Sequence, residues 1–514
     1  ISFIHFSILK IDNEFGYVIH ENYIEQILDK DIKKLFSNNV NSSNNFSKKI
    51  NFLKSFLKPN KNSPILNYSN DIQQKPIPKS NSIILVLISL FFPQSKKQFL
   101  KKLKQKIEFQ YKNKFQHAII FPPSREDELQ SGFLIVDEFQ KNSIPLLSFS
   151  FDSQINKILI DKKIPFLDLH LDTIVLSRIL KKSNMSIQII KNFKRIIKEN
   201  NLSLLYLKNN YSPLIENLFS TLSLIDISKT LLATCKFKNI LIANDGNKTG
   251  NSISLVAKNM KILSYTIMFY SWIPDPLISH QFSAEKIFVG GKHSSKTLSI
   301  SNYPKNHIIV SGNPSYDYIQ KLGSIEEEKE LIGIKFSKEK KIIVVVLSRF
   351  SDDEIWLVKL IKFCNLNNFQ IILKIHPLYK TKYNDIICKK IQFIEKNCKS
   401  LLFTITFDHD VKKLIFVSDI IITDNSILSI DAVLNKKSLI RINFKKLKSL
   451  IDKDLFEFIP HKIIESYSDL EYFLLKTNNF SISSEKYDLF CENFNNCNDG
   501  KNSERIFKIL TKNN

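Results

Sequence analysis

The sequence predicts an α/β protein with two domains, each built on a parallel β-sheet. Short runs of Ile, Val and Leu alternate with segments of helical spacing, as in repeated β–α–β units. Several of these runs end in polar turns before the next helix, as strands of parallel sheets commonly do. At 514 residues, the chain is also longer than one hydrophobic core usually supports.

Composition divides the chain into three parts. Residues 1–81 form an appendage that ends in a polar linker, because Asn, Ser, Lys and Pro dominate from about residue 37. Residues 82–320 form the first α/β domain and residues 321–514 the second. Glu326–Glu328 is interpreted either as part of a crossing between the domains or as the first turn of a surface helix. The first residue is Ile rather than Met, so we expect the natural start to be missing.

In the first domain, β-branched apolar runs predict strands and spaced apolar residues predict helices. The expected strands are 83–88, 118–121, 145–149, 239–243, 262–268, 286–289 and 307–310. A basic amphipathic helix is expected over 94–111, and the interval 165–232 is expected to be helical. The longest apolar run, 83–93, is about half a bilayer crossing and is interpreted as a buried strand.

The second domain repeats the same alternation. The expected strands are 341–347, 369–375, 401–407, 420–422 and 437–442. Helices are expected through Trp356 to Phe363 and from Ile427 to Leu434. Right-handed crossovers between such strands give a parallel sheet.

The net charge is +24, the difference between 74 basic and 50 acidic residues. Lys is spread over the whole chain with no basic arm or aromatic–basic motif, so we expect no nucleic-acid partner. The six cysteines lack a CxxC pair or zinc-type spacing, which predicts reduced thiols, no metal site and a cytoplasmic location. The cationic surface leaves open a peripheral contact with the inner membrane surface.

The segment Ser418–Arg441 carries the main candidate site. A strand over Ile420–Ile422 is followed by the polar turn Thr423-Asp424-Asn425-Ser426, and helical spacing then resumes. Unpaired N–H groups at a helix N-terminus attract phosphate, so Asp424, Asn425 and Ser426 are predicted ligands. Asp431 lies nearly two helical turns beyond Asp424 and can point back toward the turn. The alternative is a plain crossover with Asp424 or Asn425 as the N-cap.

Two further strand ends carry candidate ligands of the same phosphate. Ser348 and Arg349 follow the strand 341–347, and a guanidinium binds phosphate through two parallel hydrogen bonds. Lys374-Ile375-His376-Pro377 ends the next strand, where Pro377 favours an extended backbone at His376. We expect Lys374 and the His376 imidazole to contact the phosphate. A strand-end histidine bonded to backbone is the alternative.

The first domain offers two candidate acid–base groups. Asp245 follows the strand 239–243 in the sequence Asn244-Asp245-Gly246-Asn247, where a catalytic base could lie. Good turn chemistry explains the same four residues equally well. His280 lies in a proline-rich loop and is the second candidate, although a structural role is the commoner one for such a histidine.

The ordered set SGNPSYD (311–317), KIHP (374–377) and SDIIITDNSILSIDAVLNKKSLI (418–440) resembles GT-B glycosyltransferases of surface-polysaccharide synthesis. CDP-glycerol glycerophosphotransferases and capsular or polysialic-acid transferases are the nearest of these. The resemblance implies two Rossmann-like domains facing across a cleft, with the acceptor in the first and the donor in the second. It assigns His376 and Ser426 to the donor phosphate, and Asp431 to the ribose or glycerol-sugar side.

The resemblance also implies the reaction. A sugar or glycerophosphate would move from a CMP-, CDP- or UDP-linked donor to a glycan or lipid-linked acceptor, without a metal and without a permanently bound cofactor. The His-Gly pair that these families often carry after the strand 262–268 is replaced by Phe269-Tyr270-Ser271. A UDP-N-acetylglucosamine 2-epimerase is one alternative, although the Gly-Gly pair of that family is missing after Asp424. A non-catalytic polyanion-binding protein is the other.

Overall fold

The computed structural model describes twelve segments of the chain. They are 95–111, 114–182, 190–191, 195, 204–268, 282–300, 303–346, 355–375, 384–424, 426–444, 459–476 and 482–512. Two compact units divide the chain. Unit 1 holds Ile1–Leu129, Ser143–Thr266 and Gln281–Glu285, and unit 2 holds Gln130–Asn142, Ile267–His280 and Lys286–Asn514. The domain boundaries expected near residues 81 and 320 stay predictions.

The first sheet, sheet A, has seven strands in the order β3-β2-β1-β4-β5-β6-β7. They are β1 (His117–Phe121), β2 (Leu146–Ser150), β3 (Phe166–Asp168), β4 (Asn239–Ile242), β5 (Leu263–Ile267), β6 (Lys286–Val289) and β7 (Ile308–Val310). The described strand pairs are parallel. Every residue of β1 and β4 is buried, which explains why their sequences are nearly continuous apolar runs.

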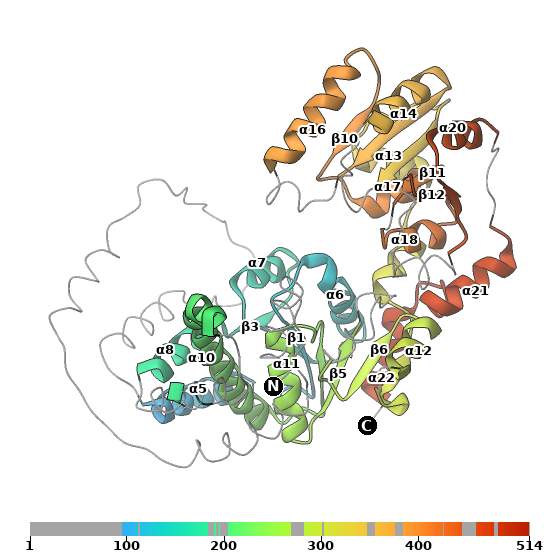
Figure 1. Cartoon of the computed structure of the whole chain (residues 1–514). Helices are drawn as coiled ribbons and strands as arrows, with labels where there is room; N and C mark the ends of the chain where they lie inside the picture. Colours follow the sequence, from blue (N-terminus) through green and yellow to red (C-terminus); the bar gives the residue numbers. More distant parts are fainter. Residues whose placement is uncertain are drawn as a thin grey trace, which may run out of the picture. The chain divides into compact units, whose positions relative to one another are not determined.

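Helices cover sheet A and form its connections (Figure 1). They are α5 (Lys96–Tyr111), α6 (Glu126–Lys141), α7 (Ser153–Asp161), α8 (His170–Lys182), α10 (Leu204–Cys235), α11 (Lys248–Asn259) and α12 (Lys292–Ile300). α5, α8 and α10 pack together against one face of the sheet. The stretch Glu216–Cys235 of α10 has the length and apolar character of a membrane span. Its Phe219, Ile227 and Leu231 are buried in the core of sheet A.

The second sheet, sheet B, has six strands in the order β10-β9-β8-β11-β12-β13. They are β8 (Lys341–Val346), β9 (Phe369–Lys374), β10 (Thr404–Thr406), β11 (Ile420–Thr423), β12 (Ser438–Ile442) and β13 (Lys462–Ile464), all joined in parallel pairs. Side chains of α14 (Ile355–Leu366), α16 (Asn384–Asn397) and α20 (Tyr467–Lys476) pack with one apolar cluster, and those of α17 (Val411–Val417), α18 (Ser429–Leu434) and α21 (Ser484–Phe494) with the other.

Most of the expected elements are confirmed within the described residues. The α/β class, the parallel sheets and the helix expected over 94–111 all hold. The expectation of helix throughout 165–232 is wrong at Phe166–Asp168, where three residues pair with β2 as an edge strand too short to show a period. The strand expected over 401–407 is limited to Thr404–Thr406. The strand expected over 83–88 lies outside the described residues.

Glu326–Glu328 lies in the first turn of a surface helix, which is one of the two interpretations of this acidic segment given above. α13 (Ile325–Ile332) begins with a capping box in which Ser324 and Glu327 satisfy each other's backbone N–H groups. Gly333 ends it in the left-handed conformation, with φ of 73°. Glu328 then pairs with Lys413 at 2.8 Å, which joins α13 to α17.

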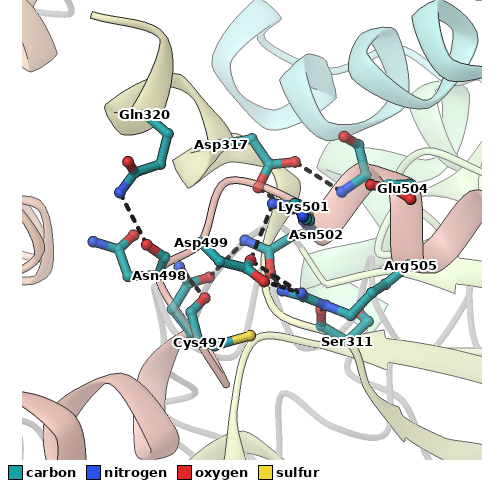
Figure 2. A network of polar contacts seen from close by, with 12 residues as sticks. Ser311, Asp317, Gln320, Cys497, Asn498, Asp499, Lys501, Asn502, Glu504 and Arg505 are labelled. Atoms are coloured by element: carbon teal, nitrogen blue, oxygen red, sulfur yellow. Dashed lines mark hydrogen bonds and ion pairs between the residues drawn. The ribbon is translucent and has the colours of Figure 1, made fainter.

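The SGNPSYD segment anchors the last helix of unit 2, α22 (Asn502–Lys512). Asp317, in the 3₁₀ helix η3 (Pro314–Lys321), accepts hydrogen bonds from the N–H groups of Asn502 at 3.0 Å and Ser503 at 2.7 Å. Arg505 donates from Nε to the Ser311 carbonyl at 2.9 Å and pairs with Asp499 (Figure 2). The motif therefore satisfies helix N-terminal groups that would otherwise be unpaired.

The turn before η3 completes this anchor. Gly312 has φ of 81°, and a Cβ there would overlap the Asn502 side chain, so glycine is required. Asn313 donates from its N–H to Asn495 Oδ1 at 2.9 Å and accepts from Ser131 Oγ of α6 at 3.0 Å. Phe507 of α22 meets Phe139 of α6 edge to face. The turn thus fixes α22 and part of α6 together within unit 2.

Replacing Asp317 by Ala is expected to loosen α22 selectively. Loss of an N-terminal cap costs about 1–2 kcal/mol, and two buried N–H groups also lose their partner. Hydrogen exchange across residues 502–512 should accelerate about tenfold or more, since 1.4 kcal/mol is a factor of ten. Asp488→Ala, at an exposed position of α21, is the control and should leave exchange in α22 unchanged. Unaltered protection of α22 in Asp317→Ala would contradict the anchoring role.

Candidate functional site

Sheet B has one position at its carboxyl edge where a ligand is expected on topological grounds. The strands run from β8 outward through β9 to β10, and then from β11 outward through β12 to β13. The connections therefore leave in opposite directions from β8 and β11. In open α/β sheets, ligands bind at this reversal of strand order. The turn Asp424–Ser426 follows one of the two strands and Ser348-Arg349 follows the other.

The end of β11 is fixed by local polar contacts. Thr423 Oγ1 donates to the Val346 carbonyl at the end of β8, at 2.6 Å, which ties the two strands together. Ser426 Oγ accepts from the N–H of Leu428 at 3.3 Å, and Ser429 Oγ donates to the Ser426 carbonyl at 2.8 Å. The chain therefore makes a polar turn between the strand and α18, as the sequence predicted.

One alternative for this turn is wrong. Asp424 is not the N-cap of α18, because the helix begins at Ser429 and its N-cap position is Leu428, which makes no side-chain cap. Asp424 has a polar or ionic partner and is half-buried. Asn425 lies outside the described residues. The Asp424 and Ser426 contacts with phosphate stay predictions.

Asp431 is the most perturbed acid of this region. It is 4% exposed in the first turn of α18, and burial raises the pKa of its carboxyl to about 6. Tyr318 donates from its hydroxyl to Asp431 Oδ1 over a long 3.4 Å, and the Lys412 ammonium favours the ionised form. A carboxylate held in this way keeps acceptor capacity for a ligand hydroxyl.

Tyr318 and Lys412 were not predicted from the sequence. Lys412 Nζ donates to the Ser315 carbonyl at 2.9 Å and lies 4.7 Å from the centre of the Tyr318 ring. Asn435 Nδ2 donates to the Tyr318 hydroxyl at 3.2 Å. The segment around 311–317 was identified as a motif, but no spacing rule relates it to residues about a hundred positions later.

Lys374 is buried at the end of β9 and bonds to backbone. Its Nζ donates to the Phe407 carbonyl at 2.6 Å and to the Ile375 carbonyl at 3.2 Å. Burial lowers the pKa of this ammonium, while Asp408 and Asp410 raise it. The residue therefore fixes the ends of β9 and β10, and its predicted contact with the donor stays a prediction.

Five other predicted residues lie outside the described residues. They are His280, Ser348, Arg349, His376 and Pro377. Ser348 and Arg349 follow β8, and His376 and Pro377 follow β9, which is its neighbour in sheet B. Their roles stay predictions.

Asp245 in unit 1 has the contacts of a structural carboxylate. It is 0% exposed, and its Oδ2 accepts from the N–H groups of Ser283 at 2.8 Å and Ala284 at 2.7 Å. Burial raises the pKa of this carboxyl to about 6, and the two backbone N–H groups oppose the rise. The predicted role of Asp245 as a base stays a prediction, and it would require the carboxylate to reach solvent.

The turn Asn244–Asn247 has the local hydrogen bonds that we gave as the alternative to a catalytic role for Asp245. Asn244 Oδ1 accepts from the Gly246 N–H at 2.9 Å, and Asn247 caps α11 through the Gly250 N–H at 3.0 Å. The turn at Asn244 and the helix cap at Asn247, both typical of asparagine, are therefore present.

Among the residues that the structure describes, no group of three His, Cys, Asp or Glu side chains could hold a metal ion.

Two Rossmann-type sheets define the GT-B architecture, and a solved structure supports this class. UDP-GlcNAc 2-epimerase from Methanocaldococcus jannaschii matches with a TM-score of 0.50 and 15% identity, over 77% of this chain and 99% of that one. At this identity the likeness concerns the fold alone. The predicted GT-B class is thereby confirmed, while the facing of the domains across a cleft stays a prediction.

Sequence comparison shows which transferases the chain is similar to. Residues 282–512 match the family described as CDP-Glycerol:Poly(glycerophosphate) glycerophosphotransferase. The teichoic acid ribitol-phosphate polymerases TarK and TarL of Staphylococcus aureus are each 26% identical over 156 residues, which is 30% of this chain. The chain spans 28% and 26% of the length of these two relatives. The resemblance to transferases of cell-surface polymer synthesis is thus confirmed.

Replacing Asp431 by Asn is expected to stabilise the protein near neutral pH. A carboxyl with a raised folded-state pKa binds its proton more tightly when folded, so its contribution to stability falls as the pH rises from about 4 to about 6. The amide that replaces the carboxyl cannot ionise, so Asp431→Asn should melt a few degrees above wild type at pH 7.5. The difference should shrink at pH 5. A variant less stable than wild type at pH 7.5 would contradict this account.

Proposed function

We propose that this protein is a metal-independent transferase of cell-surface polymer synthesis. It moves a polyol phosphate or a sugar from a CMP-, CDP- or UDP-linked donor to a growing glycan or lipid-linked acceptor. The observation that carries the proposal is the β11–turn–α18 unit at the strand reversal of sheet B, inside the region that matches the glycerophosphotransferase family. In this unit the polar turn lies between a buried strand and a buried helix.

Charge neutralisation supplies most of the proposed catalysis. As the acceptor hydroxyl oxygen bonds to the transferred group, the bond to the nucleotide phosphate breaks and its electron pair stays on the departing phosphate. His376 and Arg349 donate hydrogen bonds to that phosphate, and Ser426 adds a hydroxyl. These groups replace the charge that a metal ion would provide.

Asp431 completes the proposed donor site. Its carboxylate accepts a hydrogen bond from a ribose or glycerol hydroxyl, since Tyr318 occupies only one of its acceptor positions. In this proposal the protein is cytoplasmic, where nucleotide donors are made, and its positive charge favours a peripheral contact with anionic lipid.

A thermal-shift panel with CMP, CDP, UDP and GDP tests nucleotide binding. At 100 times its Kd, a ligand stabilises the folded state by about 2.7 kcal/mol, so a pyrimidine nucleotide should raise the melting temperature by several degrees. His376→Ala should remove this shift, because the imidazole contacts the phosphate. His307→Ala, at the last residue of the 3₁₀ helix η2 (Lys305–His307) before β7, is the matched control and should retain the shift. No shift with any nucleotide, or an equal shift in His376→Ala, would contradict the proposal.

A further inference from the structure

Sheet A has its own reversal of strand order, between β1 and β4. Its strands run from β1 through β2 to β3 in one direction and from β4 through β5 toward β7 in the other. Both strands belong to unit 1, and the register pairs His117 with Asn239 through Ile120 with Ile242. The connections from these two strands leave in opposite directions, as they do in sheet B. A second ligand position is therefore expected at this edge.

The two loops at this edge meet through a serine. Ser124, which follows β1, accepts at Oγ from Asn244 Nδ2 at 3.2 Å and from Asn247 Nδ2 at 3.1 Å, both of the loop after β4. A hydroxyl has two lone pairs and one proton. Since both lone pairs are occupied by the amides, the Ser124 hydroxyl is oriented to act as a donor.

A partly exposed carboxylate lies beside that serine. Glu128, in the first turn of α6, pairs through Oε1 with Arg125 Nε at 3.1 Å and accepts at Oε2 from Asn244 Nδ2 at 3.4 Å. Its side chain is 18% exposed, so it is held in place yet open to solvent. Two carboxylate oxygens accept about four hydrogen bonds, and these two contacts leave room for a ligand hydroxyl.

The contrast with Asp245 identifies which acid of this edge can meet a ligand. Asp245 is fully enclosed and directed at the backbone of Ser283 and Ala284. Gly250 explains why, because a Cβ there would lie 2.5 Å from Asp245 Cα, so α11 packs directly against this turn. Glu128 is the acid that faces solvent.

We propose that Ser124, Arg125, Glu128, Asn244 and Asn247, here called the sheet A edge, bind the acceptor through its hydroxyl groups. A carboxylate, a guanidinium, two amides and a hydroxyl form the donor and acceptor set that recognises a polyol or sugar. Glu128 accepts hydrogen bonds from hydroxyl groups of the acceptor through its remaining lone pairs. This inference rests on the proposed function and names its acceptor site.

Hydrogen exchange separates the two sites. The probes are CDP and a synthetic glycerol phosphate oligomer, each added alone to the full chain. The oligomer should slow exchange in peptides that cover residues 122–129 and 243–250, and CDP should slow it over 420–434. Glu128→Gln should lose most of the oligomer's protection. Glu126→Gln changes the same residue type in the same helical turn, where Glu126 pairs with Lys162, and should retain it.

The outcomes distinguish the two proposals. Protection by CDP over 420–434, with none by the oligomer at the sheet A edge, would overturn the acceptor site and leave the transferase intact. Absence of any protection by CDP would overturn the proposed function and this inference with it. In transfer from CDP-glycerol to the oligomer, Glu128→Gln should raise the KM for the oligomer by about tenfold or more, with CDP affinity unchanged within about twofold. An unchanged KM in Glu128→Gln, or an equal rise in Glu126→Gln, would contradict the acceptor site.

Discussion

The reversal of strand order in each sheet is the constraint on which the other features depend. The connections leave in opposite directions after β1 and β4, and again after β8 and β11. These two positions follow from the topology of the backbone and do not depend on any one side chain. The sequence then decides what lines them, which is mainly hydroxyl and amide groups beside a few charges.

Three buried carboxylates, those of Asp245, Asp317 and Asp431, differ in the groups that donate hydrogen bonds to them. Asp317 and Asp245 each accept two backbone N–H groups, which offsets the cost of burial and fixes a helix or a turn. Asp431 is also buried, and its carboxyl accepts from its own backbone N–H and, over a long 3.4 Å, from the Tyr318 hydroxyl, with the Lys412 ammonium nearby. Asp431 follows the polar turn at the strand reversal of sheet B, and this position makes it the candidate for a ligand.

Local patterns predicted most of the described strands because buried parallel strands are nearly continuous apolar runs. They also predicted the turn at Asp424–Ser426 and the Asx chemistry at Asn244–Asn247, since both depend on neighbours in sequence. The partners of Asp431 and the sheet A edge could not be predicted, because Tyr318 meets Asp431, and Glu128 meets Asn244, over more than a hundred residues. Asp245 was favoured for its place after a strand, yet the direction of its side chain depends on the packing of α11.

A crystal structure of the protein soaked with CDP would test the central claim most directly, namely that nucleotide binds where sheet B reverses its strand order. The account predicts electron density for the diphosphate at the loops after β8 and β11, within hydrogen-bond distance of Arg349 and Ser426. It also predicts a ribose hydroxyl beside Asp431. Density at the carboxyl edge of sheet A, or at a surface remote from both strand reversals, would contradict it.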